Sequence, residues 1–324
     1  MAKRAGVSIA TVSRVLNKTK HVEAPVEEAV WKAIKELGFT PDQHARWLSS
    51  GRSNVVGIAM PSVESWDLSP FLHACSEELN ARNFDVMVAL TDDDKTNERE
   101  LIQTLVRSHV SAVIVVTRYV DAKIRQLLTR TGVPVVLAFN EDPNSRIPAV
   151  IFDDETAAQA LANGVPENRK SRAILSQQGS EVSIDRRVSG FRRVSAKKWK
   201  MDTPVFECDG TIEGAYQASR NIFEQSCPQI LHTTSDYLAI AAIRAAYDLG
   251  LSVPRDVAIT GFGENHYSQT ATPSLTTVRI DGRNVGRLCG EGAISLLEKR
   301  TVPAVQKVGF YLVAGDSCPL RRQQ

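Results

Sequence analysis

Residues 6–17 read Gly6-Val7-Ser8-Ile9-Ala10-Thr11-Val12-Ser13-Arg14-Val15-Leu16-Asn17 and are the most informative stretch of this chain. Gly6 ends any helix before it, and Ser8 is a residue type that favours the N-cap position. The apolar side chains that follow recur at helical spacing, which predicts a buried stripe of Val12, Val15 and Leu16. The segment therefore predicts a short helix that starts just after Ser8.

The opposite face of this predicted helix combines small, hydroxyl and basic side chains. It consists of Ile9, Ala10, Thr11, Ser13, Arg14 and Asn17. Small residues at its start let a helix enter the major groove of DNA, where hydroxyl and guanidinium groups bond phosphates or base edges. Taken by itself, the segment fits a short surface helix after a turn equally well.

A second helix is predicted over residues 21–39. Pro25 suits its first turn, Glu27 and Glu28 favour the positive end of the helix dipole, and Gly38 can form a left-handed stop. Its predicted buried stripe consists of Val26, Val30, Ile34 and Leu37. A polar stretch with a short helical turn in its middle follows over residues 40–53.

Length and charge set the broad class of this protein. A chain of 324 residues exceeds what one core normally serves, so two or three domains are expected. It has no run of eighteen apolar residues and no signal-peptide pattern, and its five scattered cysteines lack metal-ligand spacing, which predicts a cytoplasmic protein with reduced thiols. Residues 1–53 hold nine Lys and Arg against five acids, a charge of +4, whereas the whole chain carries +2. This basic amino-terminal part suits a polyanionic partner.

From residue 54 onward, short apolar runs alternate with amphipathic helical stretches. The runs cover residues 55–60, 85–90, 112–116, 133–139, 149–152, 171–175, 229–232 and 256–262. Continuous β-branched runs predict strands buried on both faces, and helices between them predict parallel sheets. Two such sheets, one before and one after about Asp153, would form two lobes with a cleft between them. Ligands in such sheets bind beyond the carboxyl ends of the strands.

The order and spacing of these elements resemble the lactose/galactose repressor family (LacI/GalR). The resemblance is carried by the first fifty residues, by Thr234–Ala242, and by Gly261–Asn265 followed by Pro273–Val278. It implies an α/β fold in which an N-terminal helix-turn-helix headpiece precedes a periplasmic-binding-protein-like core of two doubly wound parallel-sheet lobes. The implied parts are a headpiece (1–40) with a shortened first helix, a hinge helix and linker (41–53), an N-terminal core lobe (54–153 with 282–310) and a C-terminal core lobe (154–281 with 311–324).

By this resemblance, Ile9 and Ala10 occupy the two positions that distinguish one operator from another. Leu48 matches a hinge-helix wedge, and an apolar side chain between base steps can kink the duplex. The residues that we assign to DNA binding are Ser8, Ile9, Ala10, Thr11, Ser13, Arg14, Asn17, His21, Ala45, Arg46 and Leu48. The alternatives are a linker residue at Leu48 and a solvated helix face at Arg14.

Candidate effector-binding residues follow the predicted strands. Hydroxyls of a sugar are matched by planar donors and acceptors, and its apolar face by an aromatic ring. The candidates are Trp66, Phe71, Asn140, Phe152, Arg187, Ser235, Asp236 and Glu264. Arg187 and Asp236 match ligand positions of the family, and a guanidinium beside a carboxylate can grip vicinal hydroxyls. The alternative for this pair is an ion pair between the lobes that contacts no ligand.

Three features depart from the family pattern. Family members have a longer first helix than Ala2–Ala5 can form, which predicts either a start upstream of Met1 or weak DNA binding. Gly263 stands where many relatives have an Asp that holds sugar hydroxyls, so either Glu264 substitutes for it or the ligand differs. Gly315-Asp316-Ser317 replaces an Arg-x-Ser pattern near the carboxyl terminus.

Together these features predict a cytoplasmic transcriptional repressor. We expect a homodimer that binds operator double-stranded DNA, responds to a sugar or sugar-phosphate effector between its lobes, and has no membrane partner. Because no P-loop, metal-ligand spacing or nucleophile–base motif occurs, we expect no catalysis, no cofactor and no metal. The alternatives are a sugar-binding protein with a non-functional DNA headpiece and an α/β enzyme that uses the acids of the cleft.

Overall fold

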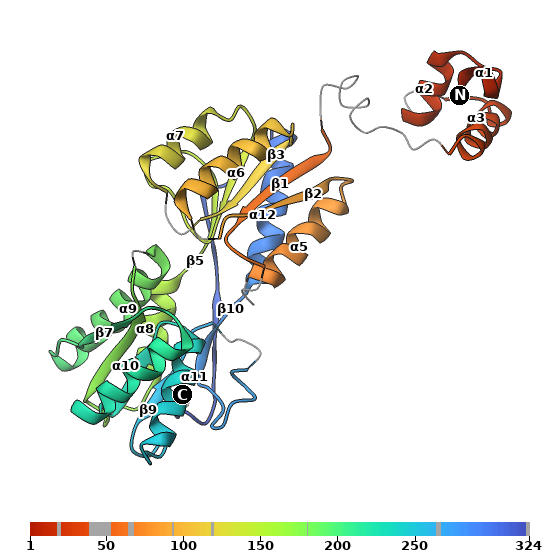
Figure 1. The fold of residues 1–324 in the computed structure, drawn as a ribbon. Helices are drawn as coiled ribbons and strands as arrows, with labels where there is room; N and C mark the ends of the chain where they lie inside the picture. Colours follow the sequence, from red (N-terminus) through yellow and green to blue (C-terminus); the bar gives the residue numbers. More distant parts are fainter. Residues whose placement is uncertain are drawn as a thin grey trace. The chain divides into compact units, whose positions relative to one another are not determined.

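The computed structural model describes residues 1–17, 21–38, 53–63, 68–92, 94–117, 120–179, 181–263 and 267–321. The chain divides into two compact units, residues 1–53 and residues 54–324 (Figure 1). We call them the headpiece and the core and describe each by itself.

The headpiece contains three helices: α1 (Ala2–Ala5), α2 (Ile9–Asn17) and α3 (Ala24–Glu36). Gly6 ends α1 in the left-handed conformation (φ 69°), and the backbone N–H of Thr11 donates to Ser8 Oγ at 3.0 Å. The predicted start of a helix just after Ser8 is therefore confirmed. Val12, Val15 and Val30 are buried together and form the centre of the headpiece.

The second predicted helix is shorter than residues 21–39. Glu23 is extended (φ −60°, ψ 137°), so α3 begins only at Ala24, and Gly38 has the predicted positive φ of 58°. Its buried residues are Val30 and Ala33, whereas Leu37 is 53% exposed. The predicted stripe was wrong at Leu37 because this residue caps the helix end, where its backbone N–H bonds Ala33 O.

The first lobe of the core is built on a six-stranded parallel sheet. Its strands are β1 (Val55–Met60), β2 (Asp85–Leu90), β3 (Ala112–Val116), β4 (Val135–Ala138), β5 (Ala149–Phe152) and β11 (Val305–Val308), in the order β11-β5-β4-β3-β1-β2. Helices α5 (Leu68–Asn80) and α12 (Gly282–Leu297) pack together on the face of Val56 and Ile58. Helices α6 (Lys95–Arg107) and α7 (Ala122–Arg130) cover the other face, where Gly57 leaves room for Leu105 (Figure 1).

The second lobe is built on a four-stranded parallel sheet. Its strands are β6 (Arg172–Gln177), β7 (Val205–Cys208), β8 (Ile230–Thr233) and β9 (Ala258–Thr260), in the order β7-β6-β8-β9. Helices α8 (Asp154–Gly164) and α9 (Val182–Trp199) pack together, as do α10 (Ile212–Gln225) and α11 (Asp236–Asp248). An antiparallel pair of β10 (Thr277–Ile280) and β12 (Phe310–Val313) completes this lobe.

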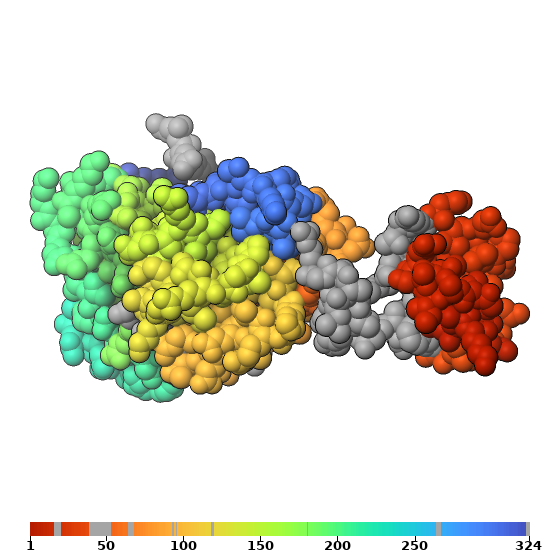
Figure 2. Space-filling view, turned by 90° about the horizontal axis from the view of Figure 1, so that it is seen from above, coloured from red at the N-terminus to blue at the C-terminus, as the bar shows by residue number. Residues whose placement is uncertain are grey.

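The chain passes between the two lobes three times. The passages lie between β5 and α8, between β10 and α12, and between β11 and β12. Asp153 and Asp281 stand at the first two and cap α8 and α12 with their side chains. In the space-filling view from above, the orange and yellow residues of the first lobe lie in front of part of the green second lobe (Figure 2).

The α/β class with a helical headpiece and two parallel-sheet lobes is confirmed. The prediction that every run is buried on both faces was wrong for β2, because it is the edge strand of its sheet and Met87, Val88 and Leu90 are exposed. The strands β7, β10, β11 and β12 were not predicted. Polar side chains interrupt the apolar pattern of β7, β10 and β11, and the apolar run of β12 was overlooked.

Candidate DNA interface and ligand pocket

One face of α2 is open to solvent in the headpiece. Ile9 is 80% exposed, and Ala10, Ser13 and Arg14 are also exposed, while Val12 and Val15 on the opposite side are buried. The polar and apolar faces thus lie as the sequence predicts. This helix presents a contact face in which small side chains surround one guanidinium.

The structure places only part of the predicted DNA-binding set. Ser8 and Thr11 lie at the start of α2 with their hydroxyl oxygens 2.9 Å apart, and His21 is exposed ahead of α3. Asn17 is the last residue of α2, and its side chain lies outside the described part. Ala45, Arg46 and Leu48 also lie outside the described residues, so their assignment stays a prediction.

A cavity of about 150 Å³ lies between the lobes of the core. An apolar cavity of roughly this size accepts one benzene ring. The first lobe contributes residues that follow β1, β3 and β4, so the cavity lies at the carboxyl edge of that sheet. The second lobe contributes the start of α8 and of α9. The lining consists of Pro61, Ser62, Leu68, Val116, Thr117, Phe139, Asn140, Phe152, Asp154, Glu181, Ser183, Arg187 and Ile280.

The charged centre of the cavity is an ion pair between Arg187 and Asp154. Arg187 Nε donates to Asp154 Oδ1 at 2.7 Å, and its Nη1 donates to the carbonyl of Thr234 at 2.8 Å. The guanidinium also lies 4.3 Å from the ring centroid of Phe262, in a cation–π arrangement. Burial raises the pKa of the Asp154 carboxyl, and the charge of Arg187 opposes that rise.

Three of the predicted effector residues line this cavity: Asn140, Phe152 and Arg187. Phe71 is fully buried in α5 and packs behind the lining residue Phe139, with ring centroids 5.4 Å apart. Trp66 and Glu264 lie outside the described residues.

Ser235 and Asp236 are not part of the lining. Ser235 caps α11, and Asp236 is buried, where it accepts hydrogen bonds from Ser268 Oγ at 2.5 Å and Thr277 Oγ1 at 2.6 Å. Asp236 therefore ties the start of α11 to β10. The predicted pairing of Arg187 with Asp236 was wrong, because the carboxylate that faces Arg187 comes from Asp154.

Sequence reasoning missed several lining residues, among them Asp154, Glu181 and Phe139. Asp154 directly follows the apolar run 149–152 and Asp153, so its position after a strand was an available signal. Glu181 lies six residues after the apolar run 171–175, so its position after a strand was a weaker signal. Phe139 was read as part of a strand, whereas it has a positive φ of 63° just after β4. That backbone conformation is rare for an aromatic residue and tends to occur at functional sites.

The described ranges lack two kinds of feature. No group of His, Cys, Asp and Glu within them could hold a metal ion. No helix within them is long and apolar enough to cross a bilayer.

Two family models match this chain. Residues 1–42 match "Bacterial regulatory proteins, lacI family", and residues 168–318 match "Periplasmic binding protein-like domain".

Among curated proteins, the chain is 30% identical over 304 residues to the ribose operon repressor of Halalkalibacterium halodurans, covering 93% of this chain and 90% of that protein. It is 26% identical over 307 residues to catabolite control protein A of Priestia megaterium, covering 93% and 92%. These relatives are named as regulators, which confirms the expectation of a protein that is not an enzyme.

A solved structure of the Lac repressor dimer bound to operator and the anti-inducer ONPF has the same fold. It superposes with a TM-score of 0.87 at 24% identity, covering 98% of this chain and 97% of that chain. The headpiece match, the nearly full-length similarity to a ribose operon repressor and the shared fold lead to one assignment. This chain belongs to the lacI family of bacterial regulatory proteins.

Proposed function

We propose that this chain is a transcriptional repressor that binds operator DNA through α2. Its affinity for the operator falls or rises when a sugar or sugar phosphate occupies the cavity between its lobes. The observation that carries the proposal is the coexistence of two sites in one chain. One is the solvent-exposed face of α2 on a basic headpiece, and the other is a polar cavity between two lobes.

The face of α2 is suited to base readout. Arg14 can bond a phosphate or the acceptor edge of a guanine, and Ile9 can contact the methyl group of a thymine. At 80% exposure, Ile9 has apolar surface that a base can cover. Ser8 holds the start of the helix, since its oxygen accepts the N–H of Thr11.

The cavity is suited to a hydroxylated ring. Phe139 and Phe152 supply apolar surface, while Asn140, Asp154 and Arg187 supply hydrogen-bonding groups around it. A ligand held by residues of both lobes favours one lobe arrangement over another. The effector then changes operator affinity by its differential affinity for the two arrangements.

Similar proteins support the same assignment. The H. halodurans relative is named a ribose operon repressor, and one solved structure with a TM-score of 0.73 is a CelR regulator in complex with cellobiose. The Lac repressor structure is a dimer on its operator. We propose that this chain also acts as a homodimer, because two recognition helices would read a pseudo-palindromic site.

We further propose that the protein works in the cytoplasm, where operator DNA is found. Its five cysteines are free, and all except Cys227 are buried. Burial raises the pKa of Cys75 to about 12, which keeps it as an unreactive thiol.

The experiment that tests the proposal is selection of binding sites from a random duplex pool, followed by titration of operator affinity against salt. We expect a pseudo-palindromic site, and a steep salt dependence with a slope of about −0.9 for each phosphate contacted. An Arg14→Gln variant should flatten that slope by roughly two contacts per dimer, one for each subunit. Lys35→Gln is the matched control, because it removes the same charge from the exposed side of α3.

Failure to enrich any site would contradict operator binding. Retained sugar binding in that case would favour the second candidate, a sugar-binding protein with a non-functional DNA headpiece. The observation that keeps this candidate in view is the four-residue length of α1.

A further inference from the structure

We infer that the effector is an uncharged polyhydroxy compound, a free sugar or polyol, and not its phosphate ester. This inference rests on the proposed function and narrows the ligand of the same cavity. It is carried by the charges that the structure places around that cavity.

The cation that a phosphate would need is already engaged. Arg187 is the one basic side chain in the described lining, and it donates to Asp154 at 2.7 Å and to the Thr234 carbonyl at 2.8 Å. Both members of the ion pair are largely buried, with side chains 12% and 2% exposed. A phosphate that bonded the remaining Nη2 group of Arg187 would bring a second anion next to a buried carboxylate that this cation already neutralises, and burying an uncompensated charge is strongly unfavourable.

Helix amino termini are the other common phosphate sites, because their free N–H groups and dipole favour anions. Two helices, α8 and α9, begin at the cavity, and both begin with acids. Asp153 caps α8 and its first turn holds Asp154 and Glu155, while Glu181 stands at the N-cap position of α9. The negative charge that these termini favour is thus supplied by the protein itself.

The same carboxylates define what the ligand must offer. Carboxylate oxygens only accept hydrogen bonds, so a group that faces Asp154 or Glu181 must donate one. A phosphate dianion brings further acceptors and like charge. A sugar hydroxyl can donate to the acids and accept from Arg187, whose Nη2 group makes no hydrogen bond to the residues that the structure describes.

The test is calorimetric titration of the full chain with matched pairs of ligands. The pairs are D-ribose with ribose 5-phosphate, D-glucose with glucose 6-phosphate and D-fructose with fructose 6-phosphate, together with inorganic phosphate as a competitor. We expect at least one free sugar to bind at least about ten-fold more tightly than its phosphate. Inorganic phosphate should not displace that sugar.

A variant tests the stated cause. Glu181→Gln removes one negative charge, and the amide oxygen that remains can still accept the hydrogen bond that Ser183 Oγ donates to Glu181 at 2.7 Å. It should narrow the difference in Kd between the sugar and its phosphate by at least about three-fold. Asp202→Asn, which removes a charge from an exposed ion pair with Arg192, should leave the difference unchanged.

Two outcomes would overturn the inference, and they differ visibly. Tighter binding of a phosphate ester, or displacement of the sugar by inorganic phosphate, refutes it while the proposed function stands. A flat response to every sugar and every phosphate refutes the proposed function, and the inference with it.

Discussion

His232 makes the stability of the core depend on pH. The ring is fully buried in β8, stacks on Phe191 with centroids 4.5 Å apart, and its Nδ1 lies 2.8 Å from Thr260 Oγ1. Burial, together with the charge of Arg172, lowers the pKa of His232 from 6.5 to about 3. Below pH 6.5, His232 therefore binds a proton in the unfolded chain but stays neutral in the folded core.

We expect this proton to lower the free energy of unfolding of the wild type by about 1.4 kcal/mol for each pH unit below 6.5. The effect should continue until the pH approaches the folded pKa of about 3. A His232→Asn variant should lack this component of the pH dependence. Urea unfolding at pH 7 and pH 5 measures both slopes, and His73→Asn, at an exposed histidine, is the control. Equal slopes for wild type and His232→Asn would contradict the assignment.

Arg187 supports the fold in addition to lining the cavity. An Arg187→Gln variant leaves the buried Asp154 carboxylate without its cation, which should lower the free energy of unfolding by about 3–5 kcal/mol. Adding Asp154→Asn should recover most of this loss, because the buried charge is then gone. Urea denaturation compares both with Arg193→Gln, whose pair also joins α9 to α8, at Glu155. Because the Arg193 side chain is 64% exposed, this pair contributes about 0–1 kcal/mol. If Arg187→Gln alone is as stable as this control, the Arg187–Asp154 pair contributes little to stability.

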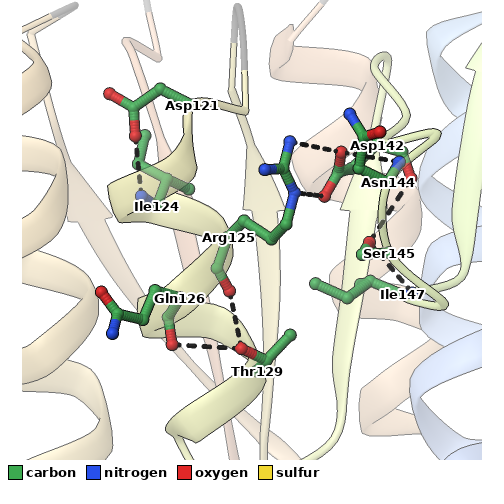
Figure 3. Close-up of polar contacts among 9 residues, drawn as sticks. All are labelled: Asp121, Ile124, Arg125, Gln126, Thr129, Asp142, Asn144, Ser145 and Ile147. Atoms are coloured by element: carbon green, nitrogen blue, oxygen red, sulfur yellow. Dashed lines mark hydrogen bonds and ion pairs between the residues drawn. The ribbon is translucent and has the colours of Figure 1, made fainter.

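At the scale of elements, the β4–β5 loop is held to α7 by one ion pair. Arg125 Nε and Nη2 donate to the two oxygens of Asp142 at 2.5 and 2.8 Å, and the N–H of Asn144 donates to the same carboxylate (Figure 3). The same loop carries Asn140 into the cavity and Glu141 to Arg186 of α9, 2.8 Å away. This ion pair therefore positions both a residue that lines the cavity and a hydrogen bond between the lobes.

We expect Asp142→Asn to loosen this loop, because a charge-assisted hydrogen bond contributes about 1.5–3 kcal/mol. Amide hydrogen exchange over residues 140–148 should accelerate, and sugar affinity should fall several-fold. Hydrogen bonds from Arg125 lower the pKa of Asp142, so this stabilisation is present above pH 3.8 and is lost as the pH falls through the lowered value. If Asp142→Asn leaves the exchange rates of the loop unchanged, the Arg125–Asp142 pair does not hold the loop. Asp202→Asn again serves as the control.

The sequence predicted elements where a local signal was strong and failed where a signal depends on tertiary contacts. Ser8 and Gly6 set the ends of helices by their own chemistry, and the apolar runs that form β1, β3 and β5 need only hydrophobic periodicity. Asp236 and Asp154 are both acids after strands, and nothing local says which one meets Arg187. The distinction depends on Ser268 and Thr277, which reach Asp236 from far along the chain.

At the scale of the whole molecule, the headpiece and the cavity must influence one another equally. If a sugar changes operator affinity by some factor, the operator must change sugar affinity by the same factor, typically about 5- to 150-fold. Calorimetric titration of the sugar with and without saturating operator duplex measures one factor, and operator titration with and without sugar measures the other. Unequal factors at equilibrium would mean that the two sites are not linked by a single pair of states.

The three passages between the lobes have a consequence for inheritance. Neither lobe is encoded by one uninterrupted stretch of gene. A nonsense codon after residue 300 would therefore damage both lobes, because it removes β11 from the sheet of the first lobe and β12, the partner strand of β10, from the second. The headpiece, in contrast, is contiguous up to residue 53. A single recombination joint there can exchange the exposed face of α2 between paralogues, whereas the two halves of the cavity have to be inherited as one block.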